Sequence, residues 1–496
     1  MDVDQATQID LFALAPELAV LGASLLVLLI ELFLHGPRKR FVNPIAVLGV
    51  LVAFGFVVAL WLDGAQRSSF GQMFVVDDYA LAFKGFFLAV ALFVLLISYR
   101  YFSEIRTFQG EYYFLMLAAF LGMMLMPSAR DLVMLFIALE LVSVPGFIMA
   151  GLRKFDLRSN EGAMKFFLFG VLSAAVLLFG LSIVYGFTGT TTLEGVAASL
   201  SAGEANPLLL AATLFVIAGF GFKVSAVPFH FWAPDTYEGA PIPVTAFLAV
   251  ASKAAGFAGL LQVTFVAFEP LADVWAPVLG VVAILTMTLG NLTALTQTNM
   301  VRLLAYSSVA HAGYVLVPFA VVQPGDAALN ADAFSAVLVY LFAYGAMNIG
   351  AFAVVIAVAR RHPGRRVSDY AGLGQRSPGL AVALTTFLVS LGGIPPLVGF
   401  VAKLAVFFVA VEAGTTLGIV LAAAVAINTV ISLVYYLRVA RVVWMEEAPE
   451  PEPEPVQPGL ALGFTVGGLA VVTVALFVLA PLLWGAADQA VLIASG

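Results

Sequence analysis

Long apolar runs alternate with short polar or charged stretches along the whole chain. Because a transmembrane helix needs about 20 predominantly apolar residues to cross the hydrocarbon core, each run counts as one span. The pattern predicts fourteen spans, at 13–34, 43–63, 79–99, 111–128, 131–152, 160–186, 207–232, 241–266, 272–293, 302–322, 332–359, 377–412, 416–437 and 459–484. The chain is therefore predicted to be an all-α integral membrane protein.

The amino-acid composition agrees with a lipid environment and excludes several classes of function. Of the 496 residues, 62% are hydrophobic and only 11% are charged, and a soluble domain cannot bury that much apolar surface. The chain has no cysteine, which excludes disulfides and thiolate-bound iron–sulfur clusters within it. A net charge of −7 and the lack of a basic patch among aromatic residues argue against nucleic-acid binding.

The distribution of Lys and Arg predicts the orientation of the spans. Sixteen of the 23 basic residues fall in loops on one side, whereas only Arg67 and Arg130 fall in loops on the other. Cytoplasmic loops are enriched in Lys and Arg, so the first side is assigned to the cytoplasm and both termini to the non-cytoplasmic side. Lys84, near the outer end of span 3, is expected to extend its long stem to the interface.

Spans 7 and 12 carry glycines and prolines in their interior, among them Gly221, Pro228, Gly393 and Pro395. Proline removes a backbone donor and clashes with the preceding turn, so both helices are predicted to be broken. Paired broken helices in two halves of a membrane protein point to a transport site. The breaks are five spans apart, and an odd number of crossings turns a repeated unit upside down. Spans 4–8 and 9–13 are therefore predicted to be two inverted five-helix repeats.

This organisation divides the chain into five predicted segments. They are a three-helix segment at 1–110, the first repeat at 111–266, the second repeat at 267–445, an acidic Pro-rich linker at 446–458 and the last span at 459–496. The linker is expected to act only as a solvated tether. The stretch at 186–207 is expected to be the longest outer loop.

Five ionisable residues lie deep within predicted spans, and we call them the central series: Glu140, Lys223, Lys253, His311 and Lys403. Each costs at least about 2.5–3.5 kcal/mol at the bilayer centre, so all are expected to face the bundle interior. Glu140 and Lys223 are the favoured pair, worth about 4 kcal/mol at ~4 Å and an effective dielectric near 20. Lys223 would hold its proton while Glu140 is near and otherwise pass it on. Lys253 and His311 are expected to come next, and Lys403 to donate to the outer side.

Several of these residues leave two interpretations open. Lys165, near the cytoplasmic end of span 6, either starts proton uptake or reaches the interface with its stem. His230, at the broken end of span 7, is either a relay or gating group or a structural one. His311 is also compatible with a neutral core histidine bonded to Tyr306 or Ser307.

Three segments carry a resemblance to a known family: FKVSAVPFHFWAPDTYEGAPIPVTAFLAVASK at 222–253, RLLAYSSVAHAGYVL at 302–316 and LVSLGGIPPLVGFVAK at 388–403. They resemble the signatures of the antiporter-like subunits of respiratory complex I. The stretch TYEGAP at 236–241 is most similar to subunit N of the bacterial proton-pumping NADH-quinone oxidoreductase. The resemblance covers spans 4–13.

The resemblance implies a fold of fourteen helices with inverted repeats, and it implies roles for single residues. Glu140 matches the family's span-5 glutamate, and the lysines of spans 7, 8 and 12 match Lys223, Lys253 and Lys403. Lys165 and His230 match further polar positions of subunit N. The chain itself is expected to hold no cofactor, while FMN, iron–sulfur clusters and quinone are expected in partner subunits of a hetero-oligomer in the bacterial cytoplasmic membrane.

The leading hypothesis is a proton-translocating subunit of NADH:quinone oxidoreductase that moves protons from the cytoplasm to the outer side. The chain would then be part of an enzyme without holding a redox centre. Two alternatives remain open. One is a subunit of a multi-subunit Na⁺/H⁺ antiporter, and the other is a passive scaffold that only bridges other membrane subunits.

Overall fold

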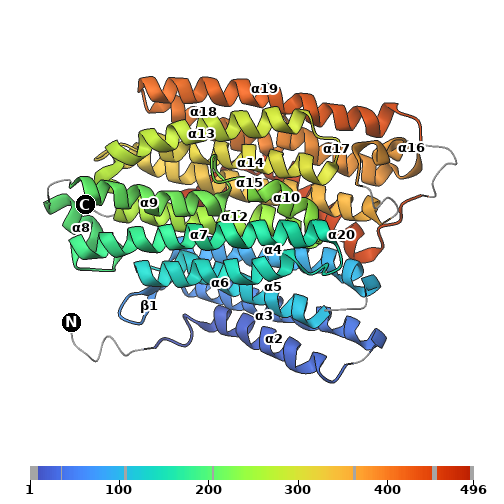
Figure 1. The fold of residues 1–496 in the computed structure, drawn as a ribbon, viewed down its shortest axis with the longest axis horizontal. Helices are drawn as coiled ribbons and strands as arrows, with labels where there is room; N and C mark the ends of the chain where they lie inside the picture. The colour runs from blue at the N-terminus through green and yellow to red at the C-terminus, as the bar shows by residue number, and fades with distance from the viewer. Residues whose placement is uncertain are drawn as a thin grey trace.

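The structure is a computed structural model that describes residues 9–34, 36–105, 109–203, 206–360, 365–448 and 455–491. Helices lying side by side along one common direction make up nearly all of it (Figure 1). The first half of the described chain contains α2 (Ala15–Glu31), α3 (Val42–Asp63), β1 (Arg67–Ser69), β2 (Phe74–Val76), α4 (Asp78–Ile105), α5 (Gln109–Ser128), α6 (Leu132–Ala150), α7 (Leu157–Thr188), α8 (Leu193–Ala202), α9 (Pro207–Val224) and α10 (Trp232–Gly239). The second half contains α11 (Ile242–Phe247), α12 (Lys253–Gln262), α13 (Ala272–Leu295), α14 (Met300–Leu316), α15 (Ala327–Ala359), α16 (Leu373–Arg376), α17 (Pro378–Gly392), α18 (Val398–Glu412), α19 (Thr416–Met445), α20 (Leu460–Val478) and α21 (Ala480–Gln489).

Twelve helical segments of the described residues are long and apolar enough to cross a membrane. This confirms the predicted all-α membrane class. Two predicted spans fall outside the twelve: span 1 is α2 with 17 residues, and span 12 is the pair α17 and α18 with 15 residues each. The total of fourteen crossings therefore stays a prediction.

Both predicted helix breaks are present. After α9 ends at Val224, Ser225 takes a left-handed conformation with φ of 60°, and a turn leads into the short helix α10. After α17 ends at Gly392, Gly393 takes φ of 86°, and α18 begins at Val398. Gly393 is needed there because a positive φ is costly for other residues. Span 7 is thus shorter than predicted, since the helix stops at Val224 and not at 232.

The helices of spans 5 and 10 begin in the same way. Asp131 caps the start of α6 with its side chain and forms an isolated antiparallel bridge with Thr192, just after α7. Asn299 caps the start of α14 with its side chain and forms the matching bridge with Arg366, after α15. The two bridges are five predicted spans apart, as an inverted five-helix repeat requires. They support the repeat, although the repeat and the five-segment division stay predictions.

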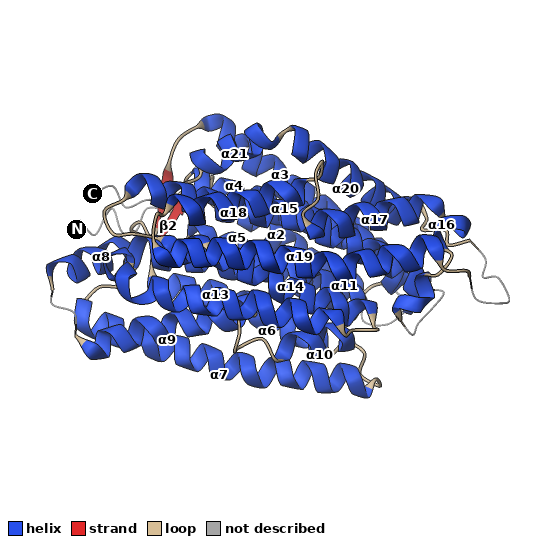
Figure 2. Cartoon of the chain, turned by 90° about the horizontal axis from the view of Figure 1, so that it is seen from above, coloured by secondary structure: helices blue, strands red, loops and turns tan. Residues whose placement is uncertain are grey.

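The centre of the bundle is made of helices that are buried on all sides. Every residue from Ile242 to Ala267 is buried, and most of α14 and α15 is buried as well. In Figure 1, α2 and α19 form opposite edges of the bundle, and in Figure 2 α7 lies along another edge. These outer helices expose large apolar side chains, as a lipid-facing or partner-facing surface does. Charged groups on the central helices are therefore shielded from lipid.

The basic residues separate towards the two ends of the bundle. Arg130 bonds through its backbone to Leu193 at the C-terminal end of α7, and Arg67 lies in the nearby strand β1, which pairs with β2. Arg158 begins α7, and it shares Glu238 with Arg302. With 32 residues at 1.5 Å each, α7 separates these groups by about 48 Å. The arrangement agrees with the predicted charge asymmetry, whereas the assignment of one end to the cytoplasm stays a prediction.

Two predicted connections and the last predicted span differ from expectation. The stretch at 186–207 is not a plain loop, because it contains the ten-residue helix α8. In the linker at 446–458, residues 449–454 lie outside the described residues, but Val456 is buried and its N–H donates to Ser377 Oγ over 2.9 Å. The end of the linker is therefore fixed to the bundle and is not a free tether. The last predicted span is divided at Leu479 into α20 and α21. Arg106 and Arg361, two of the predicted cytoplasmic cations, also lie outside the described residues.

The expectation for Lys84 was wrong. Its side chain does not reach the interface but is fully buried on α4, with Nζ 2.9 Å from Oε1 of Glu17 on α2. Nζ also lies 4.7 Å from the ring centroid of Phe74. A close counter-charge offsets part of the cost of burying an ammonium, and Glu17 provides it. The pair ties α2 to α4 in the N-terminal segment.

The variant Lys84→Ala is expected to leave the Glu17 carboxylate buried and unpaired, at a cost of about 3–5 kcal/mol. Thermal unfolding of the chain in detergent micelles measures the loss. The double variant Glu17→Leu/Lys84→Met replaces the pair by apolar groups and should remain close to the parent protein. A double variant as unstable as Lys84→Ala would contradict the interpretation that the Glu17–Lys84 ion pair ties α2 to α4.

Candidate functional site

Lys223 lies in the last turn of α9, two residues before the helix break. Its side chain is buried, with an exposed fraction of 3%, and Nζ donates to Ser143 Oγ on α6 over 3.0 Å. Gly256 on α12 makes room for the lysine stem, since a Cβ atom at that position would stand 2.9 Å from Lys223 Cγ. The neighbouring helices thus hold Lys223 in a narrow slot with a neutral oxygen at its end.

Glu140 lies one turn before Ser143 on the same helix. It forms no ion pair within 4.0 Å with Lys223, so the predicted close contact was wrong, and Ser143 takes that place. The carboxylate still attracts Lys223 electrostatically at longer range. Glu140 is only partly buried, and its neighbours Ile137 and Val144 expose 57% and 50% of their surface. It therefore lies at the outer edge of the site and faces both the lysine and the protein surface.

Lys253 begins α12 directly after the π-helical turn Leu248–Ser252. Such turns are uncommon and recur at functional positions. Nζ donates to both the carbonyl and the hydroxyl oxygen of Ser308 on α14, each over 2.8 Å. It also lies 5.9 Å from the ring centroid of Tyr237 on α10. Lys253 therefore joins a helix of the first predicted repeat to a helix of the second.

His311 lies on α14, one turn beyond Ser308, and is buried. Its Nδ1 is 2.7 Å from the hydroxyl of Tyr340 on α15, and its Nε2 is 3.2 Å from the hydroxyl of Tyr436 on α19. The alternative of a histidine bonded directly to Tyr306 or Ser307 was therefore wrong, because the direct partners are Tyr340 and Tyr436. Both ring nitrogens are engaged by tyrosine hydroxyls, which either donate or accept.

Lys403 lies on α18, soon after the second helix break. Its Nζ donates to the carbonyl oxygen of Gly392 over 3.0 Å and to Ser432 Oγ on α19 over 3.2 Å. The ring centroid of Tyr314 lies 4.8 Å away. At Gly393 a Cβ atom would come within 2.8 Å of Lys403 Cδ. The break thus supplies both a free carbonyl and the space for the lysine stem.

The three buried lysines of the central series share one property that separates them from Lys84. Among the described residues, no carboxylate lies within 4.0 Å of Nζ of Lys223, Lys253 or Lys403, and their direct partners are hydroxyl and carbonyl oxygens. Burying a charge without a counter-ion is costly, so these three side chains are in a different electrostatic environment from Lys84, which has Glu17 beside it.

Lys165 and His230 line a separate hollow of about 270 Å³, together with Asp235, Arg302 and Tyr306. Lys165 Nζ donates to Asp235 Oδ2 over 2.6 Å, so it does not simply reach for the interface. Partial burial alone would raise the pKa of Asp235, but its hydrogen bonds with Lys165 and Arg302 outweigh this and lower it below the usual value. Asp235 therefore remains a carboxylate at the mouth of the hollow.

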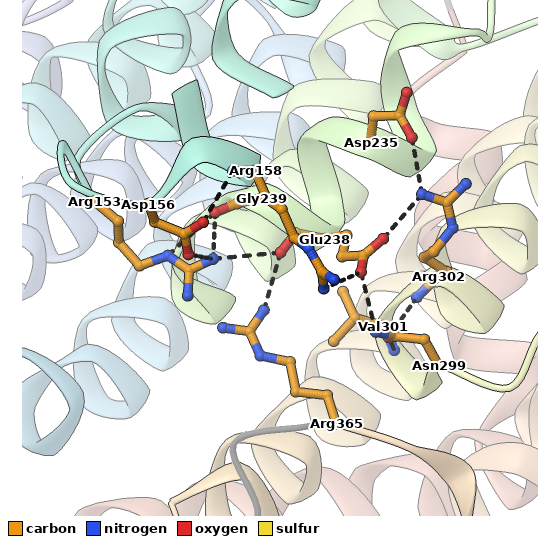
Figure 3. Close-up of polar contacts among 10 residues, drawn as sticks. All are labelled: Arg153, Asp156, Arg158, Asp235, Glu238, Gly239, Asn299, Val301, Arg302 and Arg365. Atoms are coloured by element: carbon orange, nitrogen blue, oxygen red, sulfur yellow. Dashed lines mark hydrogen bonds and ion pairs between the residues drawn. The ribbon is translucent and has the colours of Figure 1, made fainter. Parts of the chain in front are cut away.

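A network of ion pairs surrounds the short helix α10 at this end of the bundle (Figure 3). Asp235 and Glu238 both bind one guanidinium nitrogen of Arg302, over 2.8 and 2.9 Å. The C-terminal end of α10 also attracts arginines from other segments, through the Glu238 side chain or the carbonyls of Glu238 and Gly239: Arg153, Arg158 and Arg365. Cations are favoured at the C-terminal end of a helix. The network fixes the half-helix between α7 and α14.

The predicted site residues are thus brought together in three groups. Glu140 and Lys223 form the first, and Lys165 and His230 form the second. Lys253 and His311 line one small cavity of about 10 Å³, roughly the room of one water, with Ser308 and Tyr344. Lys403 follows beyond this cavity.

Sequence reasoning did not identify the partners of these residues: Ser143, Asp235, Ser308, Tyr340, Ser432 and Tyr436. Asp235 had a usable signal, because it is an acidic residue directly after the broken span. The serines and tyrosines had none, since such residues are common in membrane helices.

Nothing in the described residues suggests a cofactor site. No group of three or more His, Asp or Glu residues gathers there in a way that could hold a metal ion. Because the sequence contains no cysteine, thiolate-ligated iron–sulfur clusters do not fit this chain.

Comparison with known proteins identifies the family. Residues 129–432, which include the whole central series, match the family described as NADH:quinone oxidoreductase/Mrp antiporter, TM. The chain belongs to this family. NADH-quinone oxidoreductase subunit N of Trichlorobacter lovleyi is 42% identical over 447 residues, which cover 88% of this chain and 89% of that protein. The resemblance predicted from the sequence motifs is thereby confirmed.

Solved structures of family members have the same fold. A chain of respiratory complex I from Thermus thermophilus with bound aureothin is 30% identical, with a TM-score of 0.78 over 96% of this chain and 99% of that one. A chain of the Mrp complex from Dietzia is 21% identical, with a TM-score of 0.84 over 97% of both chains. At that identity the second likeness shows the fold alone.

The variant Gly256→Ala is expected to push the Lys223 stem away from Ser143 and to destabilise the chain by about 1–3 kcal/mol, as overpacked cores do. Thermal unfolding in detergent micelles measures the change. Gly467→Ala in α20 is the matched control, because no atom lies within 4 Å of its added Cβ. There, the better helix propensity of alanine should leave stability unchanged or slightly higher. If Gly256→Ala also leaves the thermal stability unchanged, the narrow slot around the Lys223 stem is contradicted.

Proposed function

We propose that this chain is a proton-translocating membrane subunit of NADH:quinone oxidoreductase, carrying protons from the cytoplasm to the outer side. Family membership supports this, as does the name of its relative from Trichlorobacter lovleyi, subunit N of that enzyme. The likeness to a chain of respiratory complex I over nearly the whole length supports it further. The catalytic contribution of the chain is proton transfer, while redox chemistry belongs to partner subunits.

The observation that carries the proposal is the absence of close counter-ions at Lys223, Lys253 and Lys403 within the described structure. A lysine that serves only as a clamp would be expected to have a carboxylate at contact distance, as Lys84 has in Glu17. A lysine that must exchange its proton needs partners that stabilise both states. Hydroxyl oxygens do so, since they accept from the ammonium and donate to the amine.

The geometry supports an order of transfer. Protons are taken up at the basic end, where Lys165 and His230 line the hollow beside Asp235. They pass through Lys223, which is bound to Ser143, to Lys253 and His311, which line one cavity. From there they reach Lys403 on α18, and this helix continues to Glu412 at the end of the bundle away from the arginine network.

Glu140 is the group through which proton transfer at Lys223 is regulated. It attracts Lys223 from a distance and is itself partly exposed at the edge of α6. A movement or charge change in a neighbouring subunit therefore reaches the buried lysine through this carboxylate. The energy must come from such neighbours, because this chain contains no redox centre of its own.

The proposed function also implies a location for the chain and a set of partner subunits. The chain would be one of several membrane subunits in a hetero-oligomer of the bacterial cytoplasmic membrane, with both termini on the outer side. FMN, the iron–sulfur clusters and quinone would be held by its partners. Exposed apolar faces on α2, α7 and α19 offer surfaces for other subunits and for lipid.

A second candidate is a subunit of a multi-subunit Na⁺/H⁺ antiporter, since the Mrp likeness has the same fold. Genes for NADH-binding and iron–sulfur subunits beside this one would favour the first function. Sodium-dependent rescue of growth would favour the second. A passive scaffold predicts that changes at the buried lysines affect assembly and not turnover.

The variants Lys223→Ala and Glu140→Ala are expected to lower quinone reduction and proton pumping together. A positioned proton-transfer group typically raises the rate of its step by roughly 10²–10⁴-fold. The pumping rate should therefore fall by at least about tenfold in Lys223→Ala. For Glu140→Ala, which acts at longer range, a smaller loss is expected. Both rates are measured on the assembled complex in vesicles.

Lys39→Ala serves as the control, because Lys39 lies outside the central series and is partly exposed beside Glu31. Its rates should match those of the parent complex. Normal numbers of protons pumped per electron in fully assembled Lys223→Ala complexes would refute the proposed function.

The variant Ser143→Asp tests the argument from missing counter-ions directly. It places a carboxylate where the hydroxyl contacts Lys223, so the ammonium form would be trapped by a close opposite charge. Pumping is expected to fall more than in Ser143→Ala, which only removes a hydrogen bond. Proton uptake by vesicles, measured with a pH-sensitive dye, compares the two variants. Equal rates in both would mean that Lys223 need not release its proton.

A further inference from the structure

A chain of hydrogen bonds occupies the centre of the bundle between Lys253 and Lys403. The hydroxyls of Ser307 and Tyr436 are hydrogen-bonded to each other, and Tyr436 is 3.2 Å from His311 Nε2. His311 Nδ1 is in turn 2.7 Å from the hydroxyl of Tyr340. The four groups come from three helices, α14, α15 and α19, and none exposes more than 3% of its surface. Each group is able to donate and to accept.

The first end of this chain lies beside Lys253. Ser307 is adjacent in sequence to Ser308, whose carbonyl and hydroxyl hold the Lys253 ammonium. Ser308 Oγ donates to the carbonyl of Ala305, so it does not itself continue the chain. Lys253 and His311 also line the same cavity, where there is room for about one water between them.

The second end lies beside Lys403. The rings of Tyr340 and Tyr314 are stacked with centroids 6.2 Å apart, and Lys403 Nζ lies 4.8 Å from the Tyr314 ring. The helix that carries Tyr436 also carries Ser432, which binds Lys403 one turn earlier. Both Lys253 and Lys403 act electrostatically on His311. The chain therefore lies between the surroundings of the two lysines, and the transfer requires a water or a shift of a lysine stem to complete the contact at each end.

We propose that the Tyr436 hydroxyl is the proton-passing link between Lys253 and Lys403, because it alone joins the Ser307 hydroxyl to the His311 ring. This inference rests on the proposed function and adds a relay residue to it. Tyr436 lies outside the charged motifs, on a helix that contributes no titratable member of the central series. Its ring is fully buried, so its hydroxyl position is set by packing.

The proton balance of one passage is simple. A proton that arrives at Ser307 leads its hydroxyl to release its own proton to the Tyr436 oxygen. Tyr436 passes its proton to His311 Nε2, His311 releases the proton on Nδ1 to the Tyr340 oxygen, and Tyr340 releases its own through a bridging water to the neutral amine of Lys403, which becomes an ammonium. The proton that enters at Ser307 comes from the Lys253 ammonium, which becomes a neutral amine. Each of the four groups between the lysines gains one proton and loses one, so no charge remains on the chain. His311 ends in the other tautomer, and the hydroxyls and the ring must reorient before the next proton passes.

Tyr112 on α5 provides a matched control. It is equally buried, and its hydroxyl is 2.6 Å from Ser98 Oγ on α4, so neither group belongs to a helix that contributes to the chain. Changing either tyrosine to phenylalanine removes one hydroxyl and keeps the ring. If Tyr436 only satisfied a buried polar group, the two variants would behave alike.

The experiment compares Tyr436→Phe with Tyr112→Phe in the assembled complex reconstituted in vesicles. Protons pumped per electron, quinone reduction and the solvent deuterium isotope effect on pumping are measured for both. Tyr436→Phe is expected to lower pumping about tenfold, less than the full effect of a positioned proton-transfer group because water bridges part of the gap. The isotope effect should rise as the transfer becomes rate-limiting. Tyr112→Phe should change pumping less than about twofold and leave the isotope effect unaltered.

Equal pumping and equal isotope effects in the two variants would overturn the inference. Ser307→Ala breaks the same link from its other side, so it decides the matter if Tyr436→Phe does not assemble. A loss of pumping in it supports the link, and unchanged pumping overturns it. Lys403→Ala separates the two levels of argument. If it abolishes pumping while Tyr436→Phe does not, only this inference fails, whereas normal pumping in Lys403→Ala would refute the proposed function itself.

Discussion

The interior of this bundle is organised around three buried lysine side chains without a carboxylate at contact distance among the described residues. Lys223, Lys253 and Lys403 are each held by oxygen atoms of neutral groups that neighbouring helices supply. Hydrogen bonds to these neutral oxygens lower the free-energy cost of burying the ammonium, but they do not neutralise its charge. Hydroxyl oxygens are compatible with both forms of the lysine, since they accept from the ammonium and donate to the amine. The same chain shows the other solution at Lys84, where Glu17 neutralises the charge and fixes two helices together.

The broken helices follow from this requirement. At the second break the carbonyl of Gly392 has lost its partner within the helix and accepts from Lys403 instead. Gly393, with its positive φ and missing Cβ, leaves space for the lysine stem at the same point. Gly256 does the same for Lys223 near the first break. Glycine and proline in these spans therefore serve a chemical purpose, since they expose backbone oxygen and make room where a long cation must be buried.

Much of the fold could be predicted from sequence, because hydropathy and glycine–proline interruptions are local signals. The central series was also accessible, since a charge within an apolar run has few structural explanations. What could not be predicted is which groups meet. Ser143 and Tyr436 are ordinary residues of membrane helices, and only the packing of distant segments gives them a partner. Lys84 looked like a peripheral residue for the same reason, because its counter-ion Glu17 lies 67 positions earlier in the chain.

The central helix α14 explains how the two predicted repeats are able to act as one unit. Ser308 holds Lys253, which belongs to the first repeat, while Tyr314 packs beside Lys403, which belongs to the second. His311 lies between them on the same face, one turn from each. Because α14 is almost completely buried, it cannot move without changing the surroundings of both lysines. A buried helix with a partner in each half therefore places the two predicted repeats in direct packing contact, and a change at one lysine alters the packing beside the other.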